Sequence, residues 1–141
     1  MTLETERIAI EDRFKTLWLN DDSPPTELTP IGYSSHKFEP TEAGNSARLT
    51  IKNGVATAES IGAPGTNLVR SIGVIMIQIF VPGGGGEATV RPLAETAMGI
   101  FRNVTFGGIT CWVPYVSSQM EDAPFLIWTV VAPFKRDELN G

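Results

Sequence analysis

Two residues in the sequence could act together as a nucleophile and a base: the single cysteine, Cys111, and the single histidine, His36. A thiol–imidazole pair needs a third group that orients the imidazole, and no such group stands out beside either residue. Cys111 lies inside the apolar run Ile-Thr-Cys-Trp-Val, where a cysteine usually acts as a small core residue. We therefore expect no catalytic site, and alanine at either position should leave the function of the folded protein intact.

Metal binding and acid–base chemistry find no better support in the residue pattern. One histidine, one cysteine and scattered carboxylates do not show the ligand spacing of a metal site. The acidic pairs at positions 21–22, 121–122 and 137–138 lie in polar segments, whereas an acid–base pair needs surroundings that separate the two pKa values. The sequence thus predicts no metal, no cofactor and no enzymatic activity.

Four glycines, Gly83–Gly86, stand between an expected strand and an expected helix, where phosphate-binding loops occur. A P-loop requires a lysine and a serine or threonine after the glycines, but Glu87 and Ala88 follow here. The dinucleotide-binding fingerprint needs a parallel βαβ unit, of which the sequence gives no sign. We interpret the run as a flexible connector between strand and helix. A small ligand-binding enzyme that uses this turn is the less favoured alternative.

Composition indicates one folded domain over residues 1–141, because 42% of the residues are hydrophobic and 19% are charged. A single cysteine excludes a disulfide framework. The net charge of −5 and the scattered lysines and arginines disfavour sequence-specific binding of nucleic acid. The acidic first residues do not resemble a signal peptide, and no apolar run approaches the roughly 20 residues of a membrane helix. We expect a soluble protein made in a cytoplasm.

Apolar residues recur at helical spacing in two segments, which predicts two amphipathic helices. The first helix covers about residues 4–19 and ends before Pro24 and Pro25. The second helix should begin near residue 89, because Pro92 is tolerated only in the first turn. The two apolar stripes consist of Ile10, Phe14, Leu17 and Trp18, and of Val90, Leu93, Ala94, Ala97, Met98 and Phe101.

Residues 68–81 form the most apolar strand pattern, so we expect a central strand with both faces covered. Gln78 would then be a buried amide that needs a hydrogen-bond partner. Shorter strands are expected at 47–52, 109–113 and 125–132, and an extended segment begins at 31–33. Trp18, Trp112 and Trp128 each fall on an apolar face and should build the core.

The segments between these strands are less regular. Asn53 and Gly54 form a tight-turn pair, followed either by a long loop over 55–67 or by a hairpin strand at 55–59. Residues 117–124 read as a loop, and 135–141 as a flexible charged tail. Together the elements predict an α+β fold, a two-layer sandwich of a mostly antiparallel four- to five-stranded sheet with two helices packed on one face.

The order of these segments resembles a known family. An amphipathic helix precedes Phe38–Thr41 and the strand 47–51, and a long loop then leads into 70–82 and the glycines. A helix ending at Arg102 precedes the segment Phe106–Ile109 and a closing strand. In this order the chain, from about residue 6 to 133, resembles the tail terminator and minor tail protein family of long-tailed bacteriophages, of the lambda type. The run Phe-Val-Pro, glycines, helix is the most distinctive part.

The resemblance implies a structural virion protein that forms a homo-hexameric ring at the head-proximal end of the tail, assembled in the bacterial host cytoplasm. Such a ring stops polymerisation of the tail tube and presents a surface for the neck or head-completion protein in head–tail joining. Genome DNA would pass through its lumen without sequence-specific binding, and no membrane is involved. Another phage neck protein, head–tail connector or tail completion protein on a similar fold is the alternative, since fold does not determine function.

A closed ring with heterologous contacts needs two different patches on each subunit. The first candidate is the weakly charged segment 59–70 with its flanking strand, because long irregular connections are usually functional or disordered. The charged segment 135–140 is the second candidate, for contacts along the tail axis. The expected interface residues are Glu59, Ser60, Ile61, Gly62, Asn67, Arg70, Lys135 and Arg136.

Overall fold

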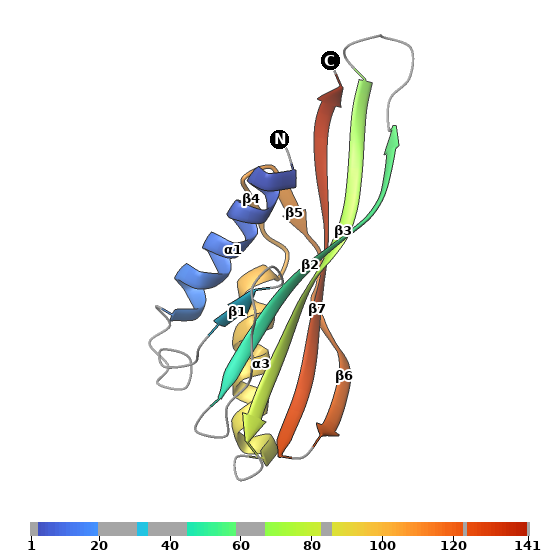
Figure 1. The fold of residues 1–141 in the computed structure, drawn as a ribbon. Coiled ribbons are helices and arrows are strands. Elements are labelled where there is room, and N and C mark those ends of the chain that lie inside the picture. Colours follow the sequence, from blue (N-terminus) through green and yellow to red (C-terminus); the bar gives the residue numbers. More distant parts are fainter. Residues whose placement is uncertain are drawn as a thin grey trace.

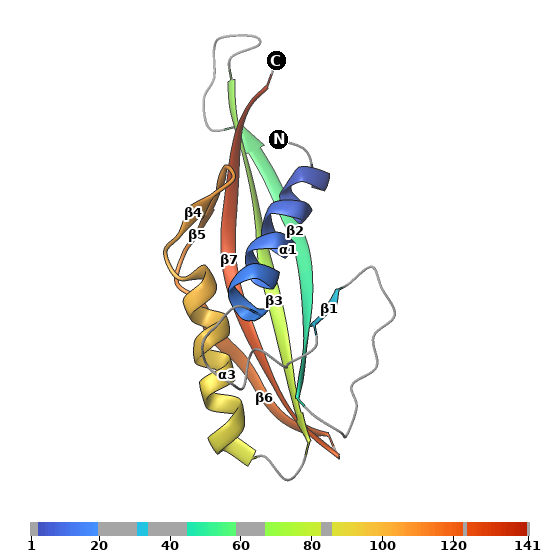
Figure 2. The same ribbon diagram turned by 90° about the vertical axis from the view of Figure 1, so that its left-hand side faces the viewer.

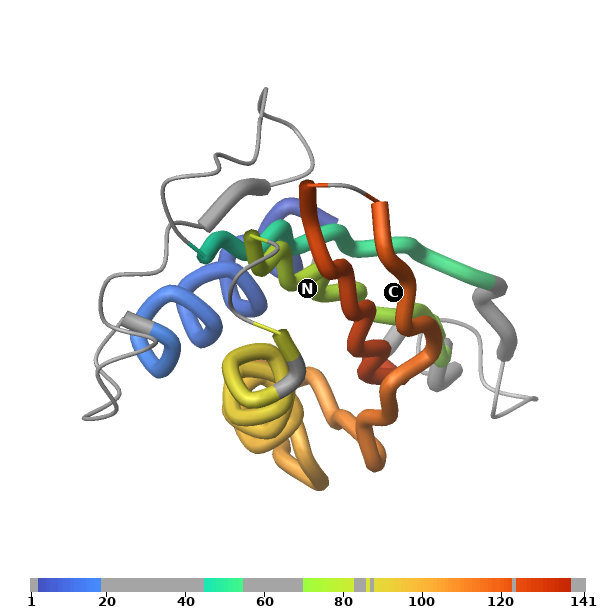
Figure 3. Tube along the Cα trace, turned by 90° about the horizontal axis from the view of Figure 1, so that it is seen from below, coloured from blue at the N-terminus to red at the C-terminus, as the bar shows by residue number. Residues whose placement is uncertain are grey.

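A computed structural model describes residues 3–19, 31–33, 45–58, 67–82, 86–122 and 124–140. Over these residues the protein has two layers, with helices α1 (Leu3–Leu19) and α3 (Gly86–Phe101) packed on one face of a long, twisted sheet (Figure 1). Figure 3, seen from below, shows the two helices as neighbours on the same side of the strands. The strands are β1 (Ile31–Tyr33), β2 (Ser46–Ala58), β3 (Asn67–Pro82), β4 (Thr105–Phe106), β5 (Ile109–Cys111), β6 (Tyr115–Asp122) and β7 (Phe125–Asn140).

The strands follow the order β1-β2-β3-β7-β5-β4, and β6 pairs with β7 beside this path. The β1–β2 pair is parallel and every other pair is antiparallel. The predicted fold class is therefore confirmed: the chain is α+β, with helices on one face of a mostly antiparallel sheet. The structure describes more strands than the expected four or five. The additional ones are the very short β1 and β4, and β6, which was expected to be a loop.

Helix α1 forms as predicted and buries Ile10, Phe14 and Trp18 completely. The rings of Phe14 and Trp18 stack with centroids 5.1 Å apart, and this stack faces α3. Leu17 was expected in the same stripe but is 40% exposed near the end of the helix. Neither helix that the structure describes is long and apolar enough to cross a membrane.

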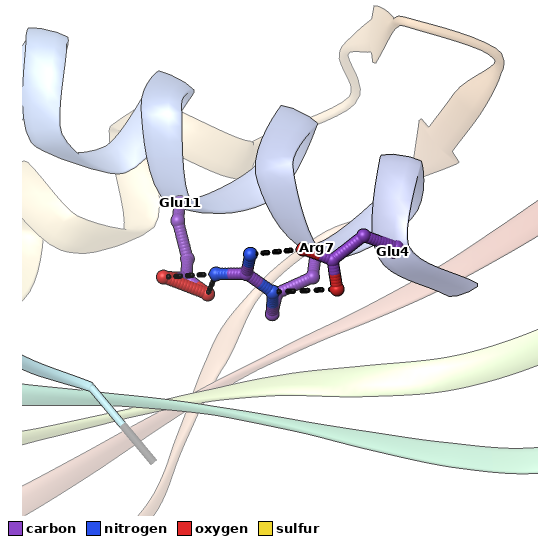
Figure 4. A network of polar contacts seen from close by, with 3 residues as sticks. All are labelled: Glu4, Arg7 and Glu11. Carbon is purple, nitrogen blue, oxygen red and sulfur yellow. Dashed lines mark hydrogen bonds and ion pairs between the residues drawn. The ribbon is translucent and has the colours of Figure 1, made fainter. Parts of the chain in front are cut away.

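Polar contacts join α1 to its neighbours on one side and link residues within the helix on the other. Arg13 Nε donates a hydrogen bond to the Ile100 carbonyl oxygen at 2.9 Å, and its guanidinium lies 4.9 Å above the Phe106 ring. On the exposed side, Arg7 lies between Glu4 and Glu11 (Figure 4), with Arg7 Nη1 2.9 Å from Glu11 Oε2. The hydrogen bond from Arg7 holds the pKa of Glu4 below its usual value. Such pairs one turn apart support the helix itself.

Helix α3 begins at Gly86, whose φ of 62° suits glycine. The expected start near residue 89 is therefore wrong, and Pro92 lies beyond the first turn. The proline leaves the carbonyl of Ala88 without its usual partner, but both residues are exposed, so water can satisfy that group. Helix α3 runs beside the lower part of the sheet (Figure 2), and Val90, Leu93 and Ala97 of its predicted apolar stripe are completely buried.

Strand β3 is central, as predicted, between β2 and β7. Its side chains alternate: Ile75, Ile77 and Ile79 are fully buried under the helices, whereas Ile72 on the opposite face is 43% exposed. Gln78 lies on that opposite face and is only half-buried. The expectation that both faces of this strand are covered, or nearly so, is therefore wrong around Ile72, although Phe80 farther along the same face is buried. Gln78 does not need an interior partner.

Strand β2 continues through Asn53 and Gly54, where a tight turn was expected. The pairing with β3 shifts register between Asn53 and Ala56, so the pair of turn-forming residues makes a β-bulge in a continuous strand. Neither the loop over 55–67 nor the hairpin strand at 55–59 is correct as expected, because residues 55–58 extend β2 and residue 67 begins β3.

Strand β7 is longer than expected and includes Pro133. The flexible tail predicted from residue 135 is wrong for residues 135–140, since each of them pairs with β3, ending with Asn140 opposite Asn67. Phe134 on the helix face is fully buried and anchors this continuation. In Figure 1 the upper ends of β3 and β7 extend together beyond α1, so the strand pair forms an arm past the helical layer.

Candidate assembly interface

Four of the eight residues predicted to form an interface lie on β3 and β7. Glu59, Ser60, Ile61 and Gly62 belong to the connection between β2 and β3, which lies outside the described residues. Asn67 begins β3 at the far end of the arm. The remaining three, Arg70, Lys135 and Arg136, lie on the neighbouring strands β3 and β7, so two segments far apart in sequence meet here.

Arg70 and Lys135 both contact one carboxylate, that of Asp137. Arg70 stands opposite Asp137 in the strand register, and its Nε and Nη2 donate hydrogen bonds to the two carboxylate oxygens at 2.8 and 3.1 Å. Lys135 Nζ lies 3.3 Å from Asp137 Oδ2. The hydrogen bond from Arg70, and then that from Lys135, keep the pKa of Asp137 below its ordinary value. The cluster is about one-third exposed, so it ties β3 to β7 and contributes little stability.

Arg136 is not a surface residue, and its assignment to an interface is wrong. Its Nε donates a hydrogen bond to Glu6 Oε1 at 3.1 Å, and both side chains are at most 5% exposed. Asn53 Nδ2 donates to the other oxygen, Glu6 Oε2, at 2.8 Å. The carboxylate therefore joins α1, β2 and β7 in the interior, because a buried charge must be paired and hydrogen-bonded.

The face of the sheet opposite the helices is the main open surface, which we call the open face. On β3 it carries Ile72, Val74, Met76 and Gln78. On β7 it carries Val131 opposite Met76 and Pro133 opposite Val74, of which Val131 is buried and Pro133 is half-buried. No described helix covers this face. The large hydrophobic side chains that are most exposed on or beside it are Ile72 at 43%, Trp112 at 45%, Val113 at 58%, Tyr115 at 51% and Met120 at 49%.

A shallow groove of about 380 Å³ lies on the open face beside Trp112. Its walls come from β2, β3 and β7 and are mostly apolar, with Ile72, Val74 and Pro133 next to the indole. Lys52 stands at its β2 side. A half-exposed tryptophan in an apolar groove is typical of the residues that dominate binding at protein interfaces. The expectation that Trp112 belongs to the core is wrong, whereas Trp18 and Trp128 are buried as predicted.

The described residues contain no group of three side chains able to hold a metal ion. Burial raises the pKa of the Cys111 thiol to about 11, although the charge of Arg13 opposes the shift. A protonated, buried thiol is a poor nucleophile. His36 lies outside the described residues. A hollow of about 310 Å³ beside Gly86 has Glu121 as the single charged side chain in its described lining, and a carboxylate would repel a phosphate.

Comparisons with known proteins show a shared fold and no family. No protein-family model matches the chain, and no curated protein matches it in sequence. Solved structures do match: one, which carries no descriptive name, aligns with 96% of this chain and 96% of its own with a TM-score of 0.70. Only 15% of the residues are identical, so this likeness shows a shared fold and nothing further.

Sequence reasoning missed the part of the surface formed by Trp112, Tyr115 and Met120. The segment 115–122 contains serines, a glutamine and two acids, which favoured a loop. It is nevertheless a strand in which all side chains except that of Val116 are exposed, so apolar alternation was never required. The missing signal was its pairing with the next strand, β7, in which Asp122 stands opposite Phe125.

Proposed function

We propose that the protein is a structural subunit that forms a closed ring, of the tail terminator type, at the head-proximal end of a bacteriophage tail tube. The observation that carries the proposal is the open face, where apolar side chains including Trp112 lie in a continuous sheet that no described helix covers. Exposed apolar surface of this kind marks sites of association. The order of elements in the sequence, which resembles the tail terminator and minor tail protein family, supports the same assignment.

In this proposal the ring stops the polymerisation of the tail tube and offers its other surface to a neck or head-completion protein. It is a homo-hexamer, a component of the virion tail that is assembled in the host cytoplasm, and genome DNA passes through its lumen. The arm of β3 and β7 reaches beyond the helical layer and supplies one of the two patches that each subunit needs.

A different neck component, such as a head–tail connector or a tail completion protein, is the second candidate. The fold is compatible with it, since related folds serve several assembly roles. An enzyme built around Gly83–Gly86 is disfavoured by Glu121, which lines the described hollow next to Gly86. A binding assay separates these assembly roles. A tail terminator binds the tail tube, whereas a head–tail connector or completion protein binds a component on the head side.

The direct test measures the oligomeric mass of the purified protein, and the length of tubes when tail tube protein polymerises with and without it. We expect a ring of about six subunits and tubes whose growth stops when the ring is added. A protein that stays monomeric both alone and with tube protein, and that leaves tube growth unchanged, would contradict the proposal.

A variant tests the arm separately. Replacing residues 60–67 by a short Gly-Ser linker should preserve the melting temperature, because the described core lies elsewhere, and should weaken ring formation or capping. A matched control inserts the same linker at Gly107 and Gly108 in the exposed β4–β5 turn. An unchanged ring with normal capping in the arm variant removes this segment from the interface.

A further inference from the structure

Two strands at opposite ends of the sheet each keep one backbone edge without a described partner. Beyond β3, strand β2 pairs only with β1, and only through residues 47–49. No described strand therefore lies beside Thr50–Ala58 on that side. Strand β6 pairs with β7 along one edge, and no described strand pairs with its other edge. The lower half of Figure 1 shows β2 and β6 on opposite sides of β3 and β7.

Unpaired strand edges present rows of N–H and C=O groups that can accept another strand. The free part of β2, residues 50–58, and the whole of β6, residues 115–122, have nearly the same length. Each could therefore satisfy the other along its full extent. The two edges cannot meet within one subunit, because β3 and β7 lie between them.

The charges of the two strands are opposite. Strand β2 carries Arg48 and Lys52 and no acidic residue, whereas β6 carries Glu121 and Asp122 and no basic residue. Lys52, Glu121 and Asp122 are all exposed. Opposite charges on adjacent strands favour their pairing, and like charges oppose it. Two β6 strands or two β2 strands would therefore repel each other, which favours a head-to-tail contact.

The irregularities of the two strands also correspond. Strand β2 holds one extra residue relative to β3 between Asn53 and Ala56, and β6 holds one relative to β7 between Val116 and Ser118. Bulges usually protect an edge from indiscriminate pairing, because they interrupt the ladder. In the register, Lys52 pairs with Val74 and Asp122 with Phe125, so both side chains point to the open face. An antiparallel alignment from Val116 opposite Ala58 brings Asp122 opposite Lys52 and keeps both bulges within the paired segments.

We propose that β6 of one subunit pairs with the free edge of β2 in a second copy of this chain, antiparallel, with Asp122 opposite Lys52. The sheet then continues from subunit to subunit. Because the two edges differ, the contact is heterologous, as the proposed ring requires. The inference rests on the proposed ring and specifies its subunit contact. Tyr115 and Met120 are half-exposed at the edge of the sheet in a single subunit. In the paired arrangement they lie inside a continuous open face that two subunits share.

Charge exchange tests the contact. Lys52→Glu and Asp122→Lys should each raise the subunit concentration needed for half-assembly at least about tenfold, and the double variant carrying both changes should restore assembly. Lys15→Glu on α1 and Glu95→Lys on α3 are matched controls, since both residues are exposed and belong to neither edge. Native mass spectrometry measures the ring, and circular dichroism verifies the fold of each variant.

Amide hydrogen exchange of the unmodified protein supplies a readout that does not depend on any variant. Residues 50–58 and 115–122 should both become protected when dilute subunits assemble. If the ring forms but neither segment gains protection, or if both single variants assemble normally, the strand pairing is wrong while the proposed function stands. A protein that forms no ring, alone or with tail tube protein, overturns both.

Discussion

Replacing Arg136 by leucine would leave the Glu6 carboxylate buried without its charged partner. The Glu6 side chain is 2% exposed and accepts hydrogen bonds from Arg136 at 3.1 Å and from Asn53 at 2.8 Å. After the substitution only the neutral amide of Asn53 remains among these two donors. Removing one partner of a buried ion pair costs about 3–5 kcal/mol. In a domain of this size that loss lowers the melting temperature by roughly 10–20 °C.

Thermal and urea unfolding, followed by circular dichroism, measure this loss. The double variant Glu6→Leu with Arg136→Leu should recover most of the stability, because apolar residues can replace a buried ion pair at little cost. Arg70→Leu is the matched control: its ion pair with Asp137 is about one-third exposed and contributes about 1 kcal/mol or less. If Arg136→Leu costs no more than Arg70→Leu, or if the double variant shows the sum of both single losses, the buried-charge argument fails.

Two further predictions concern the packing of the sheet. A Cβ at Gly73 would lie 2.7 Å from both the Lys52 carbonyl oxygen and Phe134 Cζ. Gly73→Ala should therefore lower the unfolding free energy by about 1–3 kcal/mol, measured from the urea midpoint. An unchanged midpoint would mean that the neighbouring groups make room for the methyl group at no cost. Burial raises the Cys111 pKa from 9.0 to about 11, so at pH 8 a thiol reagent should label the native protein roughly 100-fold more slowly than the unfolded chain. Rapid labelling of folded protein would contradict the buried thiol.

Helical periodicity predicted the two helices well, since both depend on local spacing. In α1 the residues Ile10, Phe14 and Trp18 repeat every four positions, and the structure buries all three. Strand β3 was equally clear, because a long apolar run that ends at a proline is typical of a central strand. What the periodicity did not reveal is which strand face the helices cover, and the open face was therefore missed.

The sequence was less informative where long-range pairing decides the conformation. Asn53 and Gly54 favour a tight turn locally, but pairing of β2 with β3 converts them into a bulge. The strand expected at 125–132 continues through Pro133 to Asn140, although proline is disfavoured inside a central strand. The burial of Arg136 depends on Glu6, which lies 130 positions away, and no local pattern could indicate it. The interface residues 59–62 lie outside the described structure, so their role remains a prediction.

The position of β7 has a consequence for how the protein is synthesised. This strand holds a central place in the sheet, but the ribosome makes it after β3, with a helix and three strands in between. Until β7 emerges, the nascent chain exposes the edge of β3 with which β7 pairs. Glu6 likewise waits for Arg136, which is made near the end of translation. Such distant contacts slow folding and leave newly made chains prone to aggregate. Chaperones that shield strand edges should therefore matter more for the yield of this protein than for one whose central strands are neighbours in sequence.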